Sequence, residues 1–352
     1  MSKKVLVTGV LGQDGANMCE FLLKDPSMKV FGMVRRVSNP NFVNCSDFLD
    51  HSNFQLVYGD LTDEVSISKL VREIQPDYFI NFAANSFVAC SWDMPLHVFD
   101  TNALGVIRCL EAIKNYQPNC RFYSAGSSEE LGDVDYSPQD INHPIKPRSP
   151  YGASKAAARH IIKVYRESHN MFAVHGVLFN HEGTKRGEEF VTRKITKGVA
   201  RIKDHLDTKM TIEAFEPIEL GNIYSKRDWS DSEDFVEGVW LMLNQEKPKD
   251  YVLASGETHT IKEFIEKAFK AAGIRGGWVE TEGRPLATIY QMSGEQYKTL
   301  VRINPKFYRP AEVALLHGDP SPAKEEGVFA TPSATGSLTA AGTGEAAGGS
   351  CA

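Results

Sequence analysis

The stretch Val5-Leu-Val-Thr-Gly-Val-Leu-Gly-Gln-Asp-Gly15 decides the fold class of this chain. Its first four residues have the apolar, β-rich character of a buried strand, and Asn17–Lys24 continues as an amphipathic helix. Between them, Gly9 permits a tight turn, Gly12 lets the backbone approach a pyrophosphate, and Gly15 lets helix and strand pack closely. The free N–H groups at the start of the helix attract phosphate. The stretch therefore predicts a strand, a turn and a helix that bind a dinucleotide.

Apolar runs and helical periodicity alternate through the first two-thirds of the chain. Strand-helix alternation of this kind favours a parallel, doubly wound sheet with helices on both faces and right-handed crossovers. We therefore expect an α/β protein whose residues 1–180 form a Rossmann domain, to which later segments return. The other expected strands are Val30–Val34, Phe54–Tyr58, Tyr78–Phe82, Arg121–Ala125 and Phe172–Leu178, and the expected helices include Leu70–Ile74, Ala103–Ile113 and Ala156–Ser168.

The alternation loosens after about Gly183. Helical patterns at Val191–Ile202, Ser232–Leu243 and Ile261–Ala271 are separated by short extended runs. Residues 181–326 are therefore expected to form mainly a smaller, mixed α/β substrate-binding lobe. Residues 327–352 are rich in Ala, Gly, Thr and Ser and are expected to be a disordered, low-complexity tail.

Composition excludes several functional classes. A formal net charge of -6, with 42% hydrophobic and 24% charged residues, is typical of a globular protein and gives no signal for nucleic-acid binding. No apolar run is long enough to span a membrane, and the N-terminus lacks the features of a signal peptide. The 6 cysteines form no Cys-x-x-Cys pair, which argues against a disulfide framework or a metal site. We expect a cytoplasmic protein.

The end of the second strand indicates which dinucleotide is bound. An acidic residue there would bind the ribose 2′-hydroxyl of NAD, but the chain has Arg35-Arg36, a pair suited to a 2′-phosphate. NADP is therefore favoured, and the alternative is two solvated arginines. Asp60-Leu61 follows the third strand near the expected adenine position. The turn Ala83-Ala84-Asn85-Ser86 follows the fourth strand and is expected to line the middle of the dinucleotide.

A tyrosine and a lysine four residues apart carry the expected redox chemistry. In Tyr151-Gly-Ala-Ser-Lys155 both side chains would share one face of a helix, one turn apart. A cationic Lys155 beside the phenol would favour the phenolate, so that Tyr151 could act as a base near neutral pH. Ser127 follows a strand at the carboxyl edge of the sheet and would hydrogen-bond the reacting sugar oxygen. The alternative for the tyrosine and lysine is a solvated helix pair.

Glu129 extends this chemistry beyond simple dehydrogenation. Removal of a proton next to a newly formed ketone needs a base, and a glutamate suits that task. A helix-start carboxylate stabilised by the helix dipole explains Glu129 equally well. Glu130 adds an ambiguity, because two adjacent glutamates cannot both point into one site.

Motifs along residues 3–325 resemble those of the extended short-chain dehydrogenases and, within them, of the GDP-mannose 4,6-dehydratases. The Phe-Asn-His-Glu and Lys-Arg-Asp-Trp motifs are more typical of the dehydratases than of the epimerases. The motifs that carry the resemblance are Thr8-Gly-Val-Leu-Gly-Gln-Asp-Gly15, Gly59-Asp-Leu-Thr62, Arg148-Ser-Pro-Tyr151, Phe179-Asn-His-Glu182, Arg186-Gly187, Glu189-Phe-Val-Thr-Arg-Lys194, Gly221-Asn222, Lys226-Arg-Asp-Trp229 and Tyr308-Arg-Pro310.

The resemblance implies conversion of GDP-mannose to GDP-4-keto-6-deoxymannose with NADP, in a homodimer or homotetramer. It aligns Ser127 with the catalytic threonine of the family and favours Glu129 as its catalytic glutamate, beside Tyr151 and Lys155. His97 stands where the family has a tyrosine near the cofactor. The cofactor contacts that it implies are Gly9, Val10, Leu11, Gly12, Gln13, Asp14, Arg35, Arg36, Val37, Ser38, Asp60, Leu61, Phe82, Ala83, Ala84, Asn85, Ser86, His97, Lys155, His181 and Arg186, and the implied sugar-nucleotide contacts are Asn180, Lys194, Arg227 and Arg309.

Two other functions remain open at this point. An NADPH-dependent reductase or epimerase of nucleotide sugars would use the same serine, tyrosine and lysine without needing Glu129 as a base. A non-catalytic NADP-binding homologue would keep the glycine turn and lack turnover. Mass spectrometry of the reaction without added NADPH separates the three hypotheses.

Overall fold

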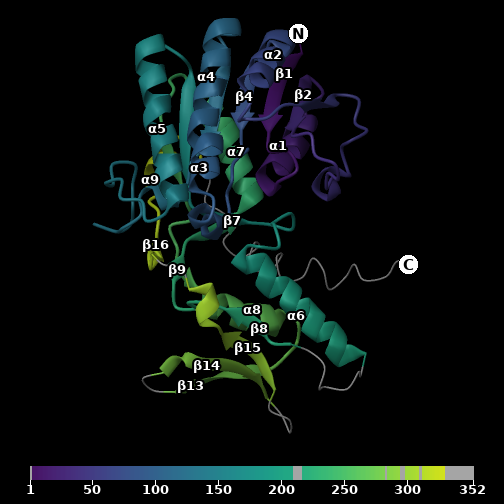
Figure 1. Cartoon of the computed structure of the whole chain (residues 1–352), viewed down its shortest axis with the longest axis vertical. Coiled ribbons are helices and arrows are strands. Elements are labelled where there is room, and N and C mark those ends of the chain that lie inside the picture. The colour runs from purple at the N-terminus through teal and green to yellow at the C-terminus, as the bar shows by residue number, and fades with distance from the viewer. Residues whose placement is uncertain (1, 209–215, 282–283, 294–297, 309–310, 330–352) are drawn as a thin grey trace.

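A seven-stranded parallel sheet forms the centre of the larger lobe in this computed structural model, which describes residues 2–208, 216–281, 284–293, 298–308 and 311–329 (Figure 1). The strand order is β11-β6-β5-β4-β1-β2-β3, and all of the pairings are parallel. Chain order reverses between β1 and β4, where sheets of this type bind ligands at their carboxyl edge. The predicted doubly wound fold is confirmed. The strands are β1 (Lys3–Thr8), β2 (Met28–Val34), β3 (Phe54–Tyr58), β4 (Tyr78–Asn81), β5 (Arg121–Ala125), β6 (Ala173–Leu178) and β11 (Tyr251–Leu253).

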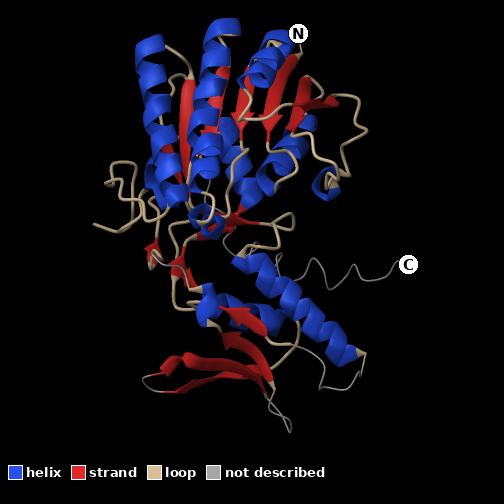
Figure 2. Cartoon of the chain, in the orientation of Figure 1, coloured by secondary structure: helices blue, strands red, loops and turns tan. Residues whose placement is uncertain are grey.

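Helices cover both faces of this sheet, as Figure 2 shows. On one face α1 (Gln13–Leu23) and α7 (Ser232–Leu243) contribute to a buried apolar cluster. On the other face the cluster includes residues of α2 (Glu64–Ile74), α4 (Gly105–Tyr116) and α5 (Pro150–His169). Strand β1 serves both clusters, because successive side chains of a strand point to opposite faces: its valines belong to the first cluster and Leu6 to the second.

A smaller lobe has its own core. Helices α6 (Val191–Asp207) and α8 (Ile261–Ala271) pack with the sheet β13-β14-β15-β8. The pairings of β13, β14 and β15 are antiparallel, whereas β15 and β8 are parallel. Helix α8 buries apolar residues at helical spacing against this sheet. The strands are β8 (Ile218–Leu220), β13 (Gly276–Thr281), β14 (Arg284–Met292) and β15 (Thr299–Ile303).

Short strand pairs lie where the two lobes meet. Strand β7 (Asn180–Glu182) pairs in parallel with β10 (Trp229–Asp231). Strand β9 (Lys226–Arg227) lies between β12 (His259–Thr260) and β16 (Leu315–Leu316). These pairs place the Phe179-Asn-His-Glu182 and Lys226-Arg-Asp-Trp229 motifs at the carboxyl edge of the main sheet.

The end of the described chain corrects one expectation. Residues 327–352 were expected to be disordered, but Val328 and Phe329 are 0% and 3% exposed. They follow α9 (Ser321–Glu325) and join the cluster that includes α7 and β11. The composition of residues 327–352 as a whole did not reveal that two apolar residues at its start are buried. Residues 330–352 lie outside the described part.

Candidate active site

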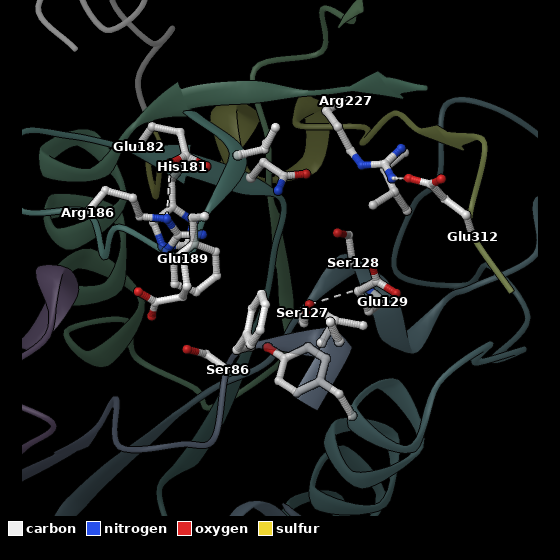
Figure 3. A pocket seen from close by; sticks show the side chains of 18 of the residues that line it. Ser86, Ser127, Ser128, Glu129, His181, Glu182, Arg186, Glu189, Arg227 and Glu312 are labelled. Carbon is white, nitrogen blue, oxygen red and sulfur yellow. Dashed lines mark hydrogen bonds and ion pairs between the residues drawn. The ribbon is translucent and has the colours of Figure 1, made fainter. Parts of the chain in front are cut away.

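A cavity of about 510 Å³ lies between the carboxyl edge of the main sheet and the smaller lobe (Figure 3). Residues at the ends of β5 and β6 and on α5 line one side of it, and residues of β7, α6 and the 306–308 segment line the other. Predicted site residues from both lobes line this cavity together: Asp14, Phe82, Ala84, Ser86, Ser127, Glu129, Tyr151, Lys155, Asn180, His181, Arg186, Lys194 and Arg227.

The glycine turn is built for close backbone approach. Gly9 has a φ of +73°, and a Cβ there would lie 2.8 Å from the nitrogen of Ala83. A Cβ on Gly15 would lie 2.3 Å from the carbonyl oxygen of Gly9. Helix α1 then begins after Gly12, so its first amides face the turn without a capping side chain. This turn fits a dinucleotide pyrophosphate, because an anion can reach the amides where side chains would have blocked it.

An ion pair joins the start of α1 to β7. His181 Nε2 lies 3.0 Å from Asp14 Oδ2, and Gln13 Nε2 donates to Asp14 Oδ1 at 3.0 Å and to the His181 carbonyl at 3.2 Å. Burial alone would raise the pKa of Asp14, but the charge and hydrogen bond of His181 lower it to about 2. Burial opposes the charged form of His181 too, yet Asp14 raises its pKa above 6.5.

The residues expected at the adenine end occupy the edge of the sheet near β2 and β3. The set Arg35, Arg36, Val37 and Ser38 directly follows β2 and is exposed. Asp60 is held in its turn by the backbone nitrogen of Thr62 at 2.9 Å and the Thr62 hydroxyl at 2.8 Å. These positions lie outside the lining of the described cavity.

Three further expected cofactor residues have mainly structural contacts. The side chain of Leu61 is buried in the core beneath α2 and α4. The backbone of Asn85 is held by the side chain of Asn102, which accepts from its nitrogen at 2.8 Å. His97 belongs to α3 (Pro95–Phe99) and is not part of the cavity lining among the described residues.

Tyr151 and Lys155 lie on one face of α5, as their spacing predicts. The helix begins at Pro150, and Ser149 Oγ accepts from Gly152 N at 3.0 Å. Lys155 Nζ donates to the Ala125 carbonyl at 2.6 Å and lies 5.9 Å from the centre of the Tyr151 ring. The lysine therefore ties α5 to the end of β5 beside the phenol.

Burial opposes the expected activation of the phenol by Lys155. Burial raises the pKa of Tyr151 above its ordinary value, while a hydrogen bond with Ser127 and the charge of Arg186 act in the opposite direction. Burial also lowers the pKa of Lys155 to about 8, because the ammonium has left water. Helical spacing predicted the proximity of the two groups but not the desolvation that dominates both pKa values.

The turn after β5 separates the two adjacent glutamates. Glu129 lines the cavity with Ser127, whose Oγ accepts from Glu129 N at 3.2 Å (Figure 3). Glu130 is fully buried and accepts with Oε1 from His175 Nε2 at 2.8 Å, away from the cavity lining. Glu129 is thus the glutamate available for chemistry, and the ambiguity between the two is removed.

The strands where the two lobes meet contribute an amide and a cation to the cavity, and α6 contributes a second cation. Asn180 Oδ1 is buried and lacks a hydrogen-bond partner among the described residues. Lys194 Nζ lies 3.7 Å from the centre of the Phe307 ring, and burial lowers the pKa of this lysine. Arg227 is 7% exposed and lies 3.4 Å from Glu312. Arg309, also expected here, lies outside the described residues.

Sequence reasoning missed Glu312, Phe307 and the Glu130–His175 pair. Phe307 directly precedes the Tyr308-Arg-Pro310 motif and Glu312 closely follows it, so the motif was the available signal for both. His175 gave no signal, because it lies within an apolar strand pattern. Within the described residues there is no cluster that could hold a metal ion, and no helix is long and apolar enough to cross a membrane.

Comparisons with known proteins agree with this geometry. The family model described as GDP-mannose 4,6 dehydratase matches residues 6–329. The GDP-mannose 4,6 dehydratase of Drosophila melanogaster is 42% identical over 332 residues, which cover 92% of this chain and 81% of that protein. Two solved structures share the fold: dTDP-glucose 4,6-dehydratase of Streptomyces venezuelae, with NAD and TYD bound (TM-score 0.78, 20% identity, 96% and 94% coverage), and RMD of Pseudomonas aeruginosa, complexed with NADPH (TM-score 0.71, 22% identity, 97% and 97% coverage). Because the family model spans most of the sequence, and the Drosophila relative covers nearly the same stretch, the chain belongs to the GDP-mannose 4,6-dehydratase family.

Proposed function

We propose that this chain converts GDP-mannose to GDP-4-keto-6-deoxymannose, with NADP as a cofactor that is restored in each cycle. The observation that carries the proposal is one cavity lined by Ser127, Tyr151 and Glu129 together with the cations Lys194 and Arg227. The first three suit oxidation and elimination on a sugar, and the cations suit its diphosphate. Membership of the GDP-mannose 4,6-dehydratase family supports the choice of substrate.

The cofactor would be held by the glycine turn and its surroundings. The two solved structures with the same fold contain NAD and NADPH, which supports a nicotinamide dinucleotide as the cofactor. The amides after Gly12 would bind the pyrophosphate, and the exposed Arg35 and Arg36 would bind a 2′-phosphate. Lys155 would hold the nicotinamide ribose. When bound, the oxidised nicotinamide would supply reversible hydride transfer with the sugar, and its positive charge would favour ionisation of a neighbouring phenol.

Tyr151 would accept the proton of the 4-hydroxyl as C4 is oxidised. Ser127 would donate a hydrogen bond to the same sugar oxygen, since its side chain lines the cavity together with the phenol. Burial raises the pKa of the Tyr151 phenol and so favours its protonated form. The proton transfer therefore depends on positive charge that a bound ligand brings into the site.

Glu129 would carry the elimination. The 4-ketone makes the C5 proton acidic, and the Glu129 carboxylate removes it. The same carboxyl group then protonates the 6-hydroxyl, which leaves as water and produces a double bond between C5 and C6. Reduction at C6 and protonation at C5 complete the product, so that the sugar loses one water and no external reductant is consumed.

The test uses GDP-mannose in deuterated water without added NADPH. Wild-type protein should give a product that has lost one water and carries deuterium at C5. Glu129→Gln should lower turnover by about 10²- to 10⁴-fold, as expected for loss of an acid-base group. The control is E188Q, because Glu188 is exposed and pairs with Lys197 outside the described cavity.

Two outcomes would contradict the proposal. Wild-type protein that removes no water would overturn the dehydratase assignment. Net consumption of NADPH, with E129Q fully active, would instead favour a reductase or epimerase.

Assembly and location stay predictions. The homodimer or homotetramer expected from the family resemblance is tested by light scattering of the purified chain. The cytoplasmic location is tested by fractionation of the source cells.

A further inference from the structure

A buried glutamate–histidine pair lies behind the catalytic turn. Glu130 and His175 are both 0% exposed, and their Oε1 and Nε2 atoms lie 2.8 Å apart. Neither residue lines the cavity, and the proposed reaction uses neither. Burial of two ionisable side chains is costly unless each is well partnered, so the pair calls for an explanation.

Glu130 holds the backbone of the serine that precedes it by three positions. Its Oε1 accepts from Ser127 N at 2.8 Å, while Ser127 Oγ accepts from Glu129 N at 3.2 Å. Together these bonds form a capping box around the short helical turn Ser128–Glu130. The Glu129 amide donates to one lone pair of Ser127 Oγ. The hydroxyl hydrogen of Ser127 therefore points away from that amide. Ser127 and Tyr151 line the same cavity, and hydrogen bonding by the Ser127 hydroxyl opposes the rise in the pKa of the phenol.

Gly126 makes the pair possible. A Cβ at this position would lie 2.2 Å from His175 Nε2 and 2.4 Å from Glu130 Oε1. The backbone nitrogen of Gly126 also donates to the Gly176 carbonyl at 2.8 Å, which joins the turn to β6. Strand β6 therefore holds the turn by two contacts: the His175 side chain bonds to Glu130, and the Gly176 carbonyl accepts from Gly126 N.

We propose that Glu130 and His175 are positioning residues, which hold the Ser127 hydroxyl in line with Tyr151 for the reaction at C4. Neither lines the cavity: Glu130 is hydrogen-bonded to the backbone nitrogen of Ser127, and His175 is hydrogen-bonded to Glu130. This inference rests on the proposed function, because it assumes that Ser127 and Tyr151 act on a bound sugar.

The test compares Glu130→Gln with Glu130→Met. Glutamine keeps an acceptor oxygen for Ser127 N and His175, whereas methionine keeps the length and removes the acceptor. The matched controls are E263Q and E263M. Glu263 completes the same type of capping box with Thr260, at 2.9 and 3.0 Å, and does not line the cavity.

The readouts are kcat and KM for GDP-mannose, and the deuterium isotope effect on kcat with substrate deuterated at C4. E130M should lower kcat by about 10- to 100-fold, as expected for a misaligned reacting group. Its isotope effect should rise, because the C4 step becomes slower, and its KM should stay within about twofold, since the binding cations are untouched. E130Q should restore kcat to within about threefold of wild type, because its hydrogen bonds remain. Both Glu263 variants should keep the wild-type isotope effect.

Folded E130M with wild-type kcat and isotope effect would overturn the proposal, as would an E130Q that is as impaired as E130M. If E130M does not fold, Glu130→Asp makes the same comparison, since it keeps the charge and withdraws the acceptor from Ser127 N. Wild-type kcat and isotope effect in E130D would then count against the inference. Failure of the proposed function is recognised separately, as a wild-type chain that forms no dehydrated product.

Discussion

The side chains around Tyr151 set how readily its phenol gives up a proton. Burial raises its pKa, and the nearby carboxylates Glu129 and Glu130 act in the same direction. The Ser127 hydrogen bond and the Arg186 charge oppose this. The phenol is therefore an acid at neutral pH until additional positive charge arrives, which suits a group that should react only when the site is filled.

Replacement of the phenol tests its role. Tyr151→Phe should lower kcat by about 10²- to 10⁴-fold, because the proton acceptor is lost. Binding of NADP, followed by fluorescence titration, should be nearly unchanged. The control is Tyr123→Phe, since Tyr123 is also buried and its hydroxyl has no hydrogen-bond partner within the described chain. Y151F with wild-type turnover would exclude the phenol from the chemistry.

The Asp14–His181 pair predicts a pH window for stability. The lowered pKa of Asp14 gives stability that is present above 3.8 and is lost as the pH falls towards 2. The raised pKa of His181 gives stability that is present below 6.5 and is lost as the pH rises past its folded value. The contribution of the pair should therefore be largest between these ordinary pKa values.

The measurement is the difference in unfolding free energy between wild type and D14N. It should be about 1–2 kcal/mol near pH 5 and smaller at both pH 2.5 and pH 8.5. The control is H259Q, because His259 and Glu263 are 3.4 Å apart with side chains that are 28% and 51% exposed. A difference that does not vary with pH would show that the pair contributes through packing alone.

At the scale of elements, the start of α1 depends on backbone contact rather than on side chains. Gly15→Ala would place a methyl group 2.3 Å from the Gly9 carbonyl, so the helix must move away from the turn. We expect a loss of at least about 2 kcal/mol in stability and at least about tenfold in NADP affinity. Chemical unfolding and cofactor titration measure the two effects.

The same substitution elsewhere in the chain is the control for G15A. A Cβ on Gly277 of β13 would meet no atom within 4 Å, so Gly277→Ala should leave both quantities unchanged or slightly raise stability. Equal effects of G15A and G277A would contradict the close-approach argument.

The sequence predicted the elements that local patterns determine. The apolar run of β1 is a buried strand, and the spacing of Tyr151 and Lys155 places them on one helix, because both patterns follow local backbone structure. Contacts between distant segments were not predictable in this way. The Arg227–Glu312 ion pair and the burial of His175 depend on how the two lobes and β6 are assembled, which single-sequence patterns do not encode.

At the scale of the whole molecule, the last described residues complete the core of the larger lobe. The Phe329 ring contacts Phe235 of α7 edge-on, with centroids 5.3 Å apart. Phe329→Ala should cost about 3–5 kcal/mol in unfolding free energy, through lost burial and the cavity left behind. Turnover per folded molecule should be unchanged, because Phe329 does not line the described cavity.

An exposed phenylalanine is the matched control for F329A. Phe99 of α3 is 41% exposed, so F99A should change the unfolding free energy by less than about 1 kcal/mol. The composition of residues 327–352 did not predict the contact between Phe329 and Phe235. Denaturation of both variants under the same conditions decides whether residues 328–329 belong to the folded core.

The β7–β10 pair has a consequence for how the enzyme meets its ligands. The family resemblance predicts different ligands for the neighbouring β7 residues Asn180 and His181, and Arg227 lies just before β10. If the bound nicotinamide cofactor strengthens the binding of GDP-mannose through this strand pair, GDP-mannose must strengthen the binding of the cofactor by the same free energy, since binding linkage is reciprocal. The affinity for the nucleotide sugar should therefore differ between protein purified with its cofactor and protein that has lost it. Values measured on the two preparations should not be compared directly.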